Sequence, residues 1–296
     1  MKYIDRKGNM TIEENEEDKL VRHLYTDRGG RLCLKMMIQP WFSRLAGAVL
    51  DTGLSARLVP GFARRNRIDM SEYEERRYYS FREFFIRKAR PEARPAAEGE
   101  KILVSPCDGR LSVHRIGHDS RFYIQEKEYS LKKLLRSENL AKRYEDGYAV
   151  VIRLTLEDGH RFCYAAEGVR SSGIALQGNY HASHTPAEDT FPVYQENARE
   201  YCLLQTVKFG TILMMELGKV CNIHKGPRKV NKGEEKGYFE FGGSTVILFL
   251  QHGRVRLDYD LMENTENGFE TIVKMGERIG EQKLPKRAGK ASGRTE

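Results

Sequence analysis

The chain has 296 residues, enough for one large domain or two small ones with a substantial core. Hydrophobic residues make up 40% and charged residues 31%, which is typical of a globular chain with a highly charged surface. The formal net charge of +8 favours acidic partners, and the five scattered cysteines, without a C-x-x-C pair, exclude a disulfide framework and indicate reduced thiols in the cytoplasm.

The N-terminal region contains no signal peptide and no membrane span by pattern. Residues 5–19 are polar, and we expect residues 1–19 to be frayed. The longest uncharged run nearby, Met36–Ser43, is far shorter than the roughly 20 residues that a spanning helix needs.

Apolar residues cluster between Arg31 and Val59, where Pro40 is expected to end one helix and start another. After Pro40 the apolar residues recur at helical spacing, which most often indicates core packing. The alternative is an amphipathic hairpin in the lipid interface, with Trp41, Phe42 and Met36–Met37 entering it.

Residues 61–95 are rich in arginine, interleaved with glutamates at pairing distance. A solvated helix face and attraction to an anionic bilayer both fit this pattern. Nucleic-acid binding fits less well, because the acids are interspersed and no binding motif is present, so we expect no nucleic-acid partner.

From Lys101 onward short apolar runs alternate with glycines and charged turns, which indicates a mainly antiparallel sheet or barrel-like body. We expect one helix at 131–144 and a disordered polar tail after Gly276. The runs expected to form strands are Ile102–Val104, Ala149–Leu154, Val193–Tyr194, Tyr201–Leu204, Ile212–Leu217 and Val246–Leu250.

Gly242 and Gly243 stand directly before Ser244 and the apolar run that follows. A glycine pair beside a strand usually marks a β-bulge or tight turn. It also lets a serine hydroxyl approach a neighbouring carbonyl closely, because glycine tolerates conformations that other residues avoid.

The order of several motifs resembles the phosphatidylserine decarboxylase family. They are S-F-R-E-F-F-I-R-K at 80–88 with R-P at 94–95, S-P-C-D-G at 105–109, H-R at 160–161, N-A-R at 197–199 and G-E-E-K-G-Y-F-E-F-G-G-S-T at 233–245. The resemblance implies that Arg87 and Arg94 are positional anchors and that Asp108 supports self-cleavage. The chemistry of the N-A-R segment stays open.

In that family the proenzyme cuts its own chain, here between Gly243 and Ser244, and the serine becomes a covalent pyruvoyl group. The serine Oγ would attack the Gly243 carbonyl, and the resulting ester would eliminate and hydrolyse to a ketone, which receives the amine of the phosphatidylserine headgroup. A hydroxyl needs an activating base for such an attack. The resemblance assigns the decarboxylation step to the first histidine of its D-Y-H-R-x-H motif, here His160, as the acid that protonates carbon.

The sequence departs from that motif twice, with Gly159 in place of the aromatic and Cys163 in place of the second histidine, the usual partner in activating the serine. Three bases remain open: Cys163 as a thiolate, which needs a depressed pKa; His160 together with Asp108, which we prefer; or His181 or His184. A zinc site from these histidines and Cys163 is disfavoured because strand positions three apart face opposite sides, so we expect no metal.

We therefore expect an α+β protein, with N-terminal helices followed by a mainly antiparallel β body. The predicted division is a helical, membrane-associating region at 1–79, a catalytic domain at 80–280 and a disordered basic tail at 281–296. The expected partners are the anionic lipid surface at the cytoplasmic face of the cell membrane, the phosphatidylserine substrate, and the two self-cleavage chains as a heterodimer, with a dimer of these left open. Two rival functions stay open, a pyruvoyl decarboxylase of a soluble amino acid and a non-catalytic, unprocessed family member that binds anionic lipid.

Overall fold

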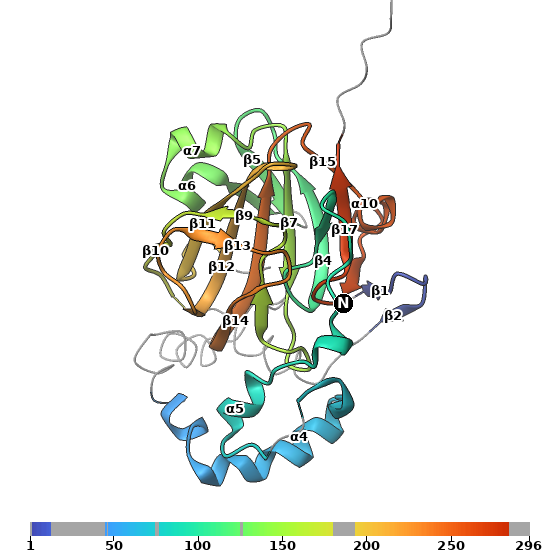
Figure 1. Cartoon of the computed structure of the whole chain (residues 1–296), viewed down its shortest axis with the longest axis vertical. Coiled ribbons are helices and arrows are strands. Elements are labelled where there is room, and N and C mark those ends of the chain that lie inside the picture. The colour runs from blue at the N-terminus through green and yellow to red at the C-terminus, as the bar shows by residue number, and fades with distance from the viewer. Residues whose placement is uncertain are drawn as a thin grey trace, which may run out of the picture.

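A large, mostly antiparallel sheet forms the body of the protein, and short helices cover its two ends (Figure 1). The computed structural model describes residues 2–12, 45, 47–74, 77–124, 127–179 and 193–283. The predicted α+β class, with N-terminal helices before a mainly antiparallel β body, is confirmed.

The large sheet has 12 strands, in the order β13-β9-β11-β12-β14-β7-β4-β16-β1-β2, with β10 beside β11 and β8 beside β14. Their bounds are β1 Lys2–Ile4, β2 Met10–Ile12, β4 Gly109–Arg115, β7 Tyr148–Arg153, β8 Arg161–Cys163, β9 Gly168–Arg170, β10 Ile174–Leu176, β11 Arg199–Thr206, β12 Gly210–Asn222, β13 Arg228–Val230, β14 Glu235–Leu250 and β16 Glu270–Val273. Two smaller sheets contain β3 Ile102–Val104, β15 Val255–Leu257 and β17 Arg278–Gln282, and β5 Arg121–Ile124 with β6 Lys127–Ser130.

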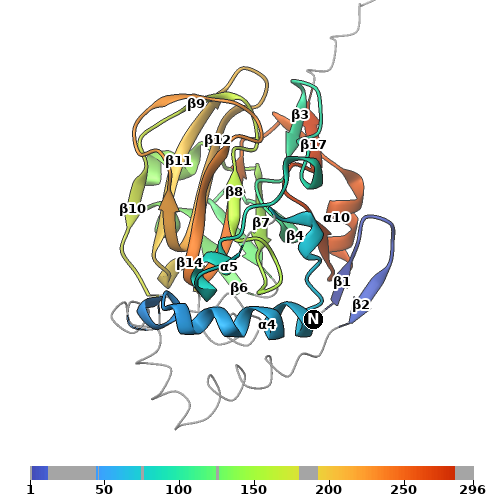
Figure 2. The same cartoon turned by 60° about the horizontal axis from the view of Figure 1, so that its bottom comes forward.

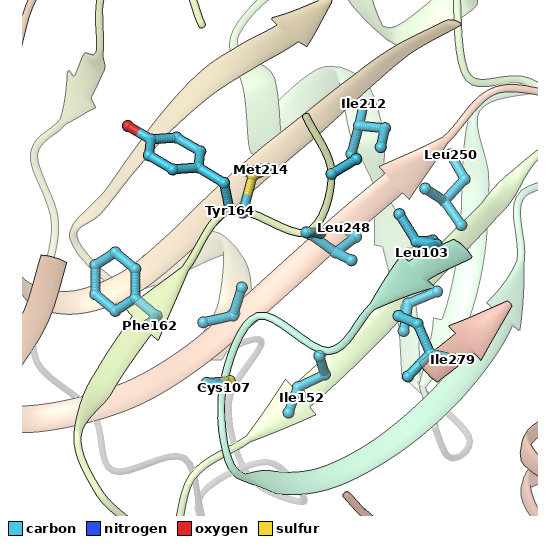
Figure 3. Close-up of a cluster of buried hydrophobic side chains, with 14 of the residues drawn as sticks. Leu103, Cys107, Ile152, Phe162, Tyr164, Ile212, Met214, Leu248, Leu250 and Ile279 are labelled. Atoms are coloured by element: carbon cyan, nitrogen blue, oxygen red, sulfur yellow. The ribbon is translucent and has the colours of Figure 1, made fainter. Parts of the chain in front are cut away.

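The long strand β14 lies between β12 and β7 and divides the hydrophobic core into two layers. Because successive strand residues face opposite sides, Val246, Leu248 and Leu250 join one buried cluster. Ile247 and Phe249 join the cluster on the other face. Figure 3 shows the first cluster, in which Leu248 of β14 lies near Met214 of β12.

The helices before the sheet pack at the lower end of the body in Figure 1 and run beneath it in Figure 2. Their aromatic residues form a third, smaller cluster around Phe81 and Phe84, to which Phe62 and the β14 residue Phe241 also belong. The helical elements here are η1 Gly53–Leu58, α4 Val59–Arg65, η2 Met70–Glu72, α5 Phe81–Phe85 and η3 Pro91–Ala93. The remaining helices are α6 Leu131–Leu135, α7 Glu138–Lys142, α9 Val193–Glu196 and α10 Tyr259–Glu266.

Four sequence-based expectations are corrected by the structure. The N-terminus is not frayed over residues 2–12, because β1 pairs in parallel with β16 and so joins the large sheet. The run at Val193–Tyr194 is helical. The helix expected at 131–144 is two helices, since Arg136 adopts a left-handed conformation (φ +50°) and Ser137 caps the next helix by accepting from the Leu140 amide. The polar segment after Gly276 contains strand β17.

Candidate active site

Ser244 lies at the end of a break in the pairing of β14 with β12. Ser244 stands opposite Gly218, yet the next residue of β12, Lys219, stands opposite Glu240. Residues 241–243 therefore have no counterpart on β12 and form an extended β-bulge. The Gly243–Ser244 peptide bond joins this bulge to the regular half of the strand.

The regular half of β14 holds Ser244 firmly. Its side chain is buried, with 6% of the residue surface exposed, and its carbonyl accepts from the Leu154 amide at 3.0 Å. Thr245 then pairs with Arg153 of β7 and with Leu217 of β12. The serine is thus fixed on its C-terminal side, while the glycines before it lie outside the ladder with β12.

Stacked aromatic rings connect the bulge to His160. Phe241 of the bulge stacks on Phe85 of α5 with ring centroids 4.0 Å apart. Phe85 stacks in turn on the His160 imidazole at 3.6 Å, with 27° between the planes. The sequence motifs F-F-x-R, H-R and F-G-G-S-T therefore meet in one region of the fold.

His160 is buried, and its local contacts fix the tautomer of the neutral ring. Nδ1 lies 3.0 Å from the Asp158 carbonyl oxygen, which can only accept, so Nδ1 carries the proton and Nε2 carries a lone pair. Burial, with a smaller contribution from the Arg87 charge, lowers the pKa of His160 to about 3. The imidazole is therefore neutral at physiological pH, with the lone pair of Nε2 unprotonated.

Arg87 anchors the turn that carries His160. One guanidinium nitrogen of Arg87 donates to the Glu157 carbonyl. The guanidinium carbon also lies over the rings of Tyr73, at 4.4 Å, and Phe84, at 4.7 Å. This contact pattern agrees with the positional role expected for Arg87.

The glycine at 159 has a steric reason. A Cβ at this position would lie 3.3 Å from Cε1 of Tyr73, closer than ordinary van der Waals contact. Tyr73, which comes from the segment after η2, thus occupies the space beside residue 159. An aromatic side chain at 159 would require Tyr73 to move.

Asp108 is paired with Arg94. The Arg94 Nε donates to one Asp108 oxygen at 2.8 Å, its Nη2 donates to the other at 2.8 Å, and the Met275 amide donates at 2.7 Å. Both side chains are almost fully buried. Asp108 acts on His160 through its charge, which favours the imidazolium, while its described hydrogen bonds go to Arg94 and Met275.

Cys163 does not meet the requirement for a thiolate base. Its Sγ lies 3.9 Å from the Ser105 carbonyl oxygen in the buried core. Burial, with a smaller contribution from the Asp108 charge, raises the pKa of Cys163 to about 12. The thiol is therefore un-ionised near neutral pH. His181 and His184, the third choice of base, lie outside the described residues.

The N-A-R segment has a structural explanation. Arg199 is buried and donates to the carbonyl oxygens of Leu134 at the end of α6, at 2.9 Å, and of Asn197, at 2.8 Å. A guanidinium satisfies orphaned carbonyls at a helix C-terminus well. Arg199 therefore holds α6 against β11.

Sequence reasoning missed Tyr73, Phe85 and Phe241 as neighbours of the site. Phe85 and Phe241 lie inside the motifs F-F-x-R and F-G-G-S-T, so the aromatic content of these motifs was the available signal. Tyr73 is outside every motif, and only the packing beside Gly159 reveals it.

An apolar surface lies on the N-terminal helical segment. Leu45, Val49, Leu54 and Leu58 have 57–71% of their surfaces exposed. Exposed arginines at 57, 64 and 65 accompany them. Among the residues that the structure describes, no helix has the length and apolar content to cross a bilayer. Trp41, Phe42 and Met36–Met37, expected in the same surface, lie outside the described residues.

Comparison with known proteins gives a consistent result over nearly the whole chain. A family model described as phosphatidylserine decarboxylase matches residues 81–281. A phosphatidylserine decarboxylase proenzyme of Fusobacterium nucleatum is 36% identical, covering 96% of this chain and 98% of that protein. Phosphatidylserine decarboxylase proenzyme 2 of Clostridium acetobutylicum is 35% identical over 91% of this chain and 94% of its own, and the proenzyme of Chlamydia caviae is 35% identical over 95% and 97%.

Proposed function

This chain belongs to the phosphatidylserine decarboxylase family, and on that premise we propose that its catalytic group is a pyruvoyl formed from Ser244 by self-cleavage. The activity is that of the family, a carbon–carbon lyase that decarboxylates phosphatidylserine to phosphatidylethanolamine. The observation that carries the proposal is the bulge at 241–243, which ends at the proposed scissile bond. The match at 81–281 also supports the division into a catalytic domain at 80–280. The N-terminal strand β1 lies outside that range in sequence but pairs with β16 in the same sheet.

The local geometry suits an attack of a side chain on its own backbone. Ser244 Oγ attacks the Gly243 carbonyl carbon, and the peptide C–N bond breaks to leave an ester and a free amine at residue 244. Glycine on the carbonyl side leaves the approach unhindered. Because residues 241–243 lie outside the ladder with β12, this peptide can distort without breaking pairs on that side.

His160 and Asp108 are the residues proposed to assist. The Nε2 lone pair of neutral His160 fits a base that accepts the serine proton, and the buried Asp108 charge favours the imidazolium that results. For the later protonation of carbon, His160 must act as an acid. A pKa of about 3 makes the imidazole a weak base and leaves the imidazolium almost unpopulated near neutral pH, so both roles require this pKa to rise during the reaction.

The residues present fit a pyruvoyl group. Ser244 follows two glycines, is buried in a strand, and becomes the first residue of the C-terminal chain after the cut. Once formed, the group supplies an electron sink for a substrate that bears an amine next to a carboxylate. The protein's own part is to keep water away, and the stack of the buried Phe85 on the partly buried Phe241, in the bulge that ends at Ser244, supports that role.

The membrane surface is the proposed source of substrate. The apolar residues Leu45, Val49, Leu54 and Leu58, flanked by arginines, would enter the lipid interface at the cytoplasmic face of the membrane. We expect the protein to sediment with phosphatidylserine vesicles and the Leu54→Ser/Leu58→Ser variant to sediment less. Val207→Ser is the matched control, because Val207 is 93% exposed on the β11–β12 turn, away from this segment. Equal sedimentation of all three proteins would exclude this surface.

The decisive experiment is the mass of the purified protein and of Ser244→Ala. The wild type should consist of two chains, 1–243 and 244–296, which stay together as a heterodimer, and the second should begin with a pyruvoyl group. Ser244→Ala should be one intact chain without decarboxylase activity. Ser112→Ala is the control, since Ser112 is another buried strand serine, and it should be processed normally. An intact, inactive wild-type chain would leave only a lipid-binding protein.

A further inference from the structure

A buried ion pair in the core is not used by the chemistry described so far. The Lys236 ammonium donates to Glu216 Oε2 at 2.6 Å and to Asn222 Oδ1 at 2.9 Å. The Glu216 and Lys236 side chains are 0% and 1% exposed. Glu216 Oε1 has no hydrogen-bond partner among the described residues. A buried pair of this kind costs desolvation that a hydrophobic pair would avoid, so stability alone does not explain it.

Glu216 lies on the same face of the sheet as Ser244. On β12, Ile212 and Met214 belong to the first core cluster, so Glu216 and Gly218 face that side by alternation. On β14, Val246 and Leu248 belong to the same cluster, so Ser244 faces it too. Ser244 is opposite Gly218, and Glu216, opposite Val246, is its diagonal neighbour. Diagonal neighbours are within reach of long side chains.

The backbone directs the α-hydrogen of Ser244 toward Gly218. The Ser244 carbonyl points to the β7 side, where it accepts from Leu154, and the Gly218 amide points to the β11 side, where it donates to the Ala198 carbonyl. Ser244 therefore occupies a non-hydrogen-bonded position opposite Gly218, a position from which the α-hydrogen of a regular strand points toward the neighbouring strand. Gly218 itself, with φ +123°, departs from regular strand geometry at the start of the bulge. Glycine at 218 has no side chain that would shield this hydrogen.

We propose that Glu216 is the base that removes the Ser244 α-hydrogen after the acyl shift, with Lys236 positioning its carboxylate. The proton moves from Cα to Glu216 Oε1, the released electron pair forms the Cα–Cβ double bond, and the Cβ–Oγ bond breaks. The Gly243 carboxylate leaves as the new C-terminus, and residue 244 becomes dehydroalanine, whose hydrolysis gives the ketone and ammonia. This inference rests on the proposed self-cleavage at Ser244.

Two properties suit Glu216 for this step. Burial raises the pKa of Glu216, although Lys236 opposes the shift, and a carboxylate with a raised pKa is a stronger base. Lys236 engages Oε2, so the other oxygen remains available. The step also differs from the one assigned to His160, which accepts the hydroxyl proton before the ester exists.

The test uses the ester as a readout. In Glu216→Gln the acyl shift still occurs, but elimination should slow by about 100-fold or more, the usual contribution of a general base. Native full-length Glu216→Gln should therefore run as one chain, and hydroxylamine should convert it to two. Mass spectrometry should find a hydroxamate on Gly243 and an unmodified serine, not a pyruvoyl group, at the start of the second chain.

Two further variants complete the experiment. Glu216→Gln/Lys236→Met removes both charges, so that no buried charge is left unpaired. This double variant should give the same hydroxylamine-sensitive chain, and it provides the test if Glu216→Gln alone fails to fold. Glu128→Gln is the control, because Glu128 is also a strand glutamate in an ion pair, with Arg121 in the separate β5–β6 sheet, and it should process normally.

Formation of the pyruvoyl group at the wild-type rate in the folded double variant would overturn the proposal. So would arrest without sensitivity to hydroxylamine, which would place the block before the ester. Both outcomes are distinct from failure of the proposed function, in which the wild type itself stays uncut.

Discussion

The buried, neutral state of His160 predicts a specific loss of stability in acid. Burial lowers the pKa of His160 from 6.5 to about 3. The unfolded chain therefore binds this proton more readily than the folded chain does. The stability linked to His160 is present above pH 6.5 and is lost as the pH falls toward 3.

The size of the effect follows from the difference between the two pKa values. At pH 5 the unfolded histidine is almost fully protonated and the folded one is not. With about 1.36 kcal/mol per pH unit, the free energy of unfolding should fall by about 2 kcal/mol between pH 7.5 and pH 5 because of His160 alone. His114, which is half-buried and has its pKa lowered to about 4 by desolvation, adds a loss of the same sign in every variant that retains it.

The assay is urea unfolding at the two pH values, carried out in a Ser244→Ala background so that one uncut chain unfolds. The fall in stability should be about 2 kcal/mol smaller in His160→Asn than in the parent, because the variant has no group to titrate there. His118→Asn is the control, since the His118 side chain is 90% exposed, and its fall should match that of the parent. An equal fall in the parent and in His160→Asn would refute the assignment of a buried, neutral imidazole.

Three other substitutions test the surroundings of the site. Cys163→Ala should cut itself at the wild-type rate, measured by the appearance of the short chain, because the thiol is un-ionised; a much slower rate would restore Cys163 as a candidate base. Phe85→Ala should cost about 3–5 kcal/mol in urea unfolding and should move the pKa of His160, followed by NMR, up toward 6.5, and an unmoved pKa would contradict the role of burial. Arg94→Met should cost about 3–5 kcal/mol because it leaves the Asp108 carboxylate buried and unpaired, whereas the double variant with Asp108→Asn should recover part of that loss.

The sequence predicted the central strands well because each contains a run of apolar residues that is long enough to indicate a buried strand. Val246–Leu250 is a continuous apolar run and Ile212–Leu217 is apolar except for Glu216, as expected for strands buried on both faces, and they form the middle of the sheet. Val193–Tyr194 is too short to distinguish a strand from a helix, and the structure makes it helical. The N-terminal strand β1 forms by pairing with β16, which is far away in the sequence. With 3 residues it is too short to show the alternation of apolar and polar residues by which a strand is recognised.

The candidate site was only partly predictable. Motifs indicated Ser244, His160 and Asp108, but not their partners. Asp108 pairs with Arg94 through a tertiary contact between two different segments of the chain, and sequence patterns do not specify such a contact. The environment that makes His160 neutral also arises from packing, since Phe85 is distant in the chain. A pKa depends on such neighbours, so residue type alone could not predict it.

The position of the proposed cut inside β14 affects how the two chains behave afterwards. The first product ends with residues 235–243, of which 235–240 lie in the pairing with β12 and β8, and the second begins with 244–250, which remains between β12 and β7 of the first. Cutting the backbone therefore separates the chains covalently while each stays inserted in the other's sheet. The short chain could leave only if the central sheet opened, so a molecule that cut itself incorrectly could not exchange its damaged chain for an intact one. Each copy of the protein would have a single opportunity to become active.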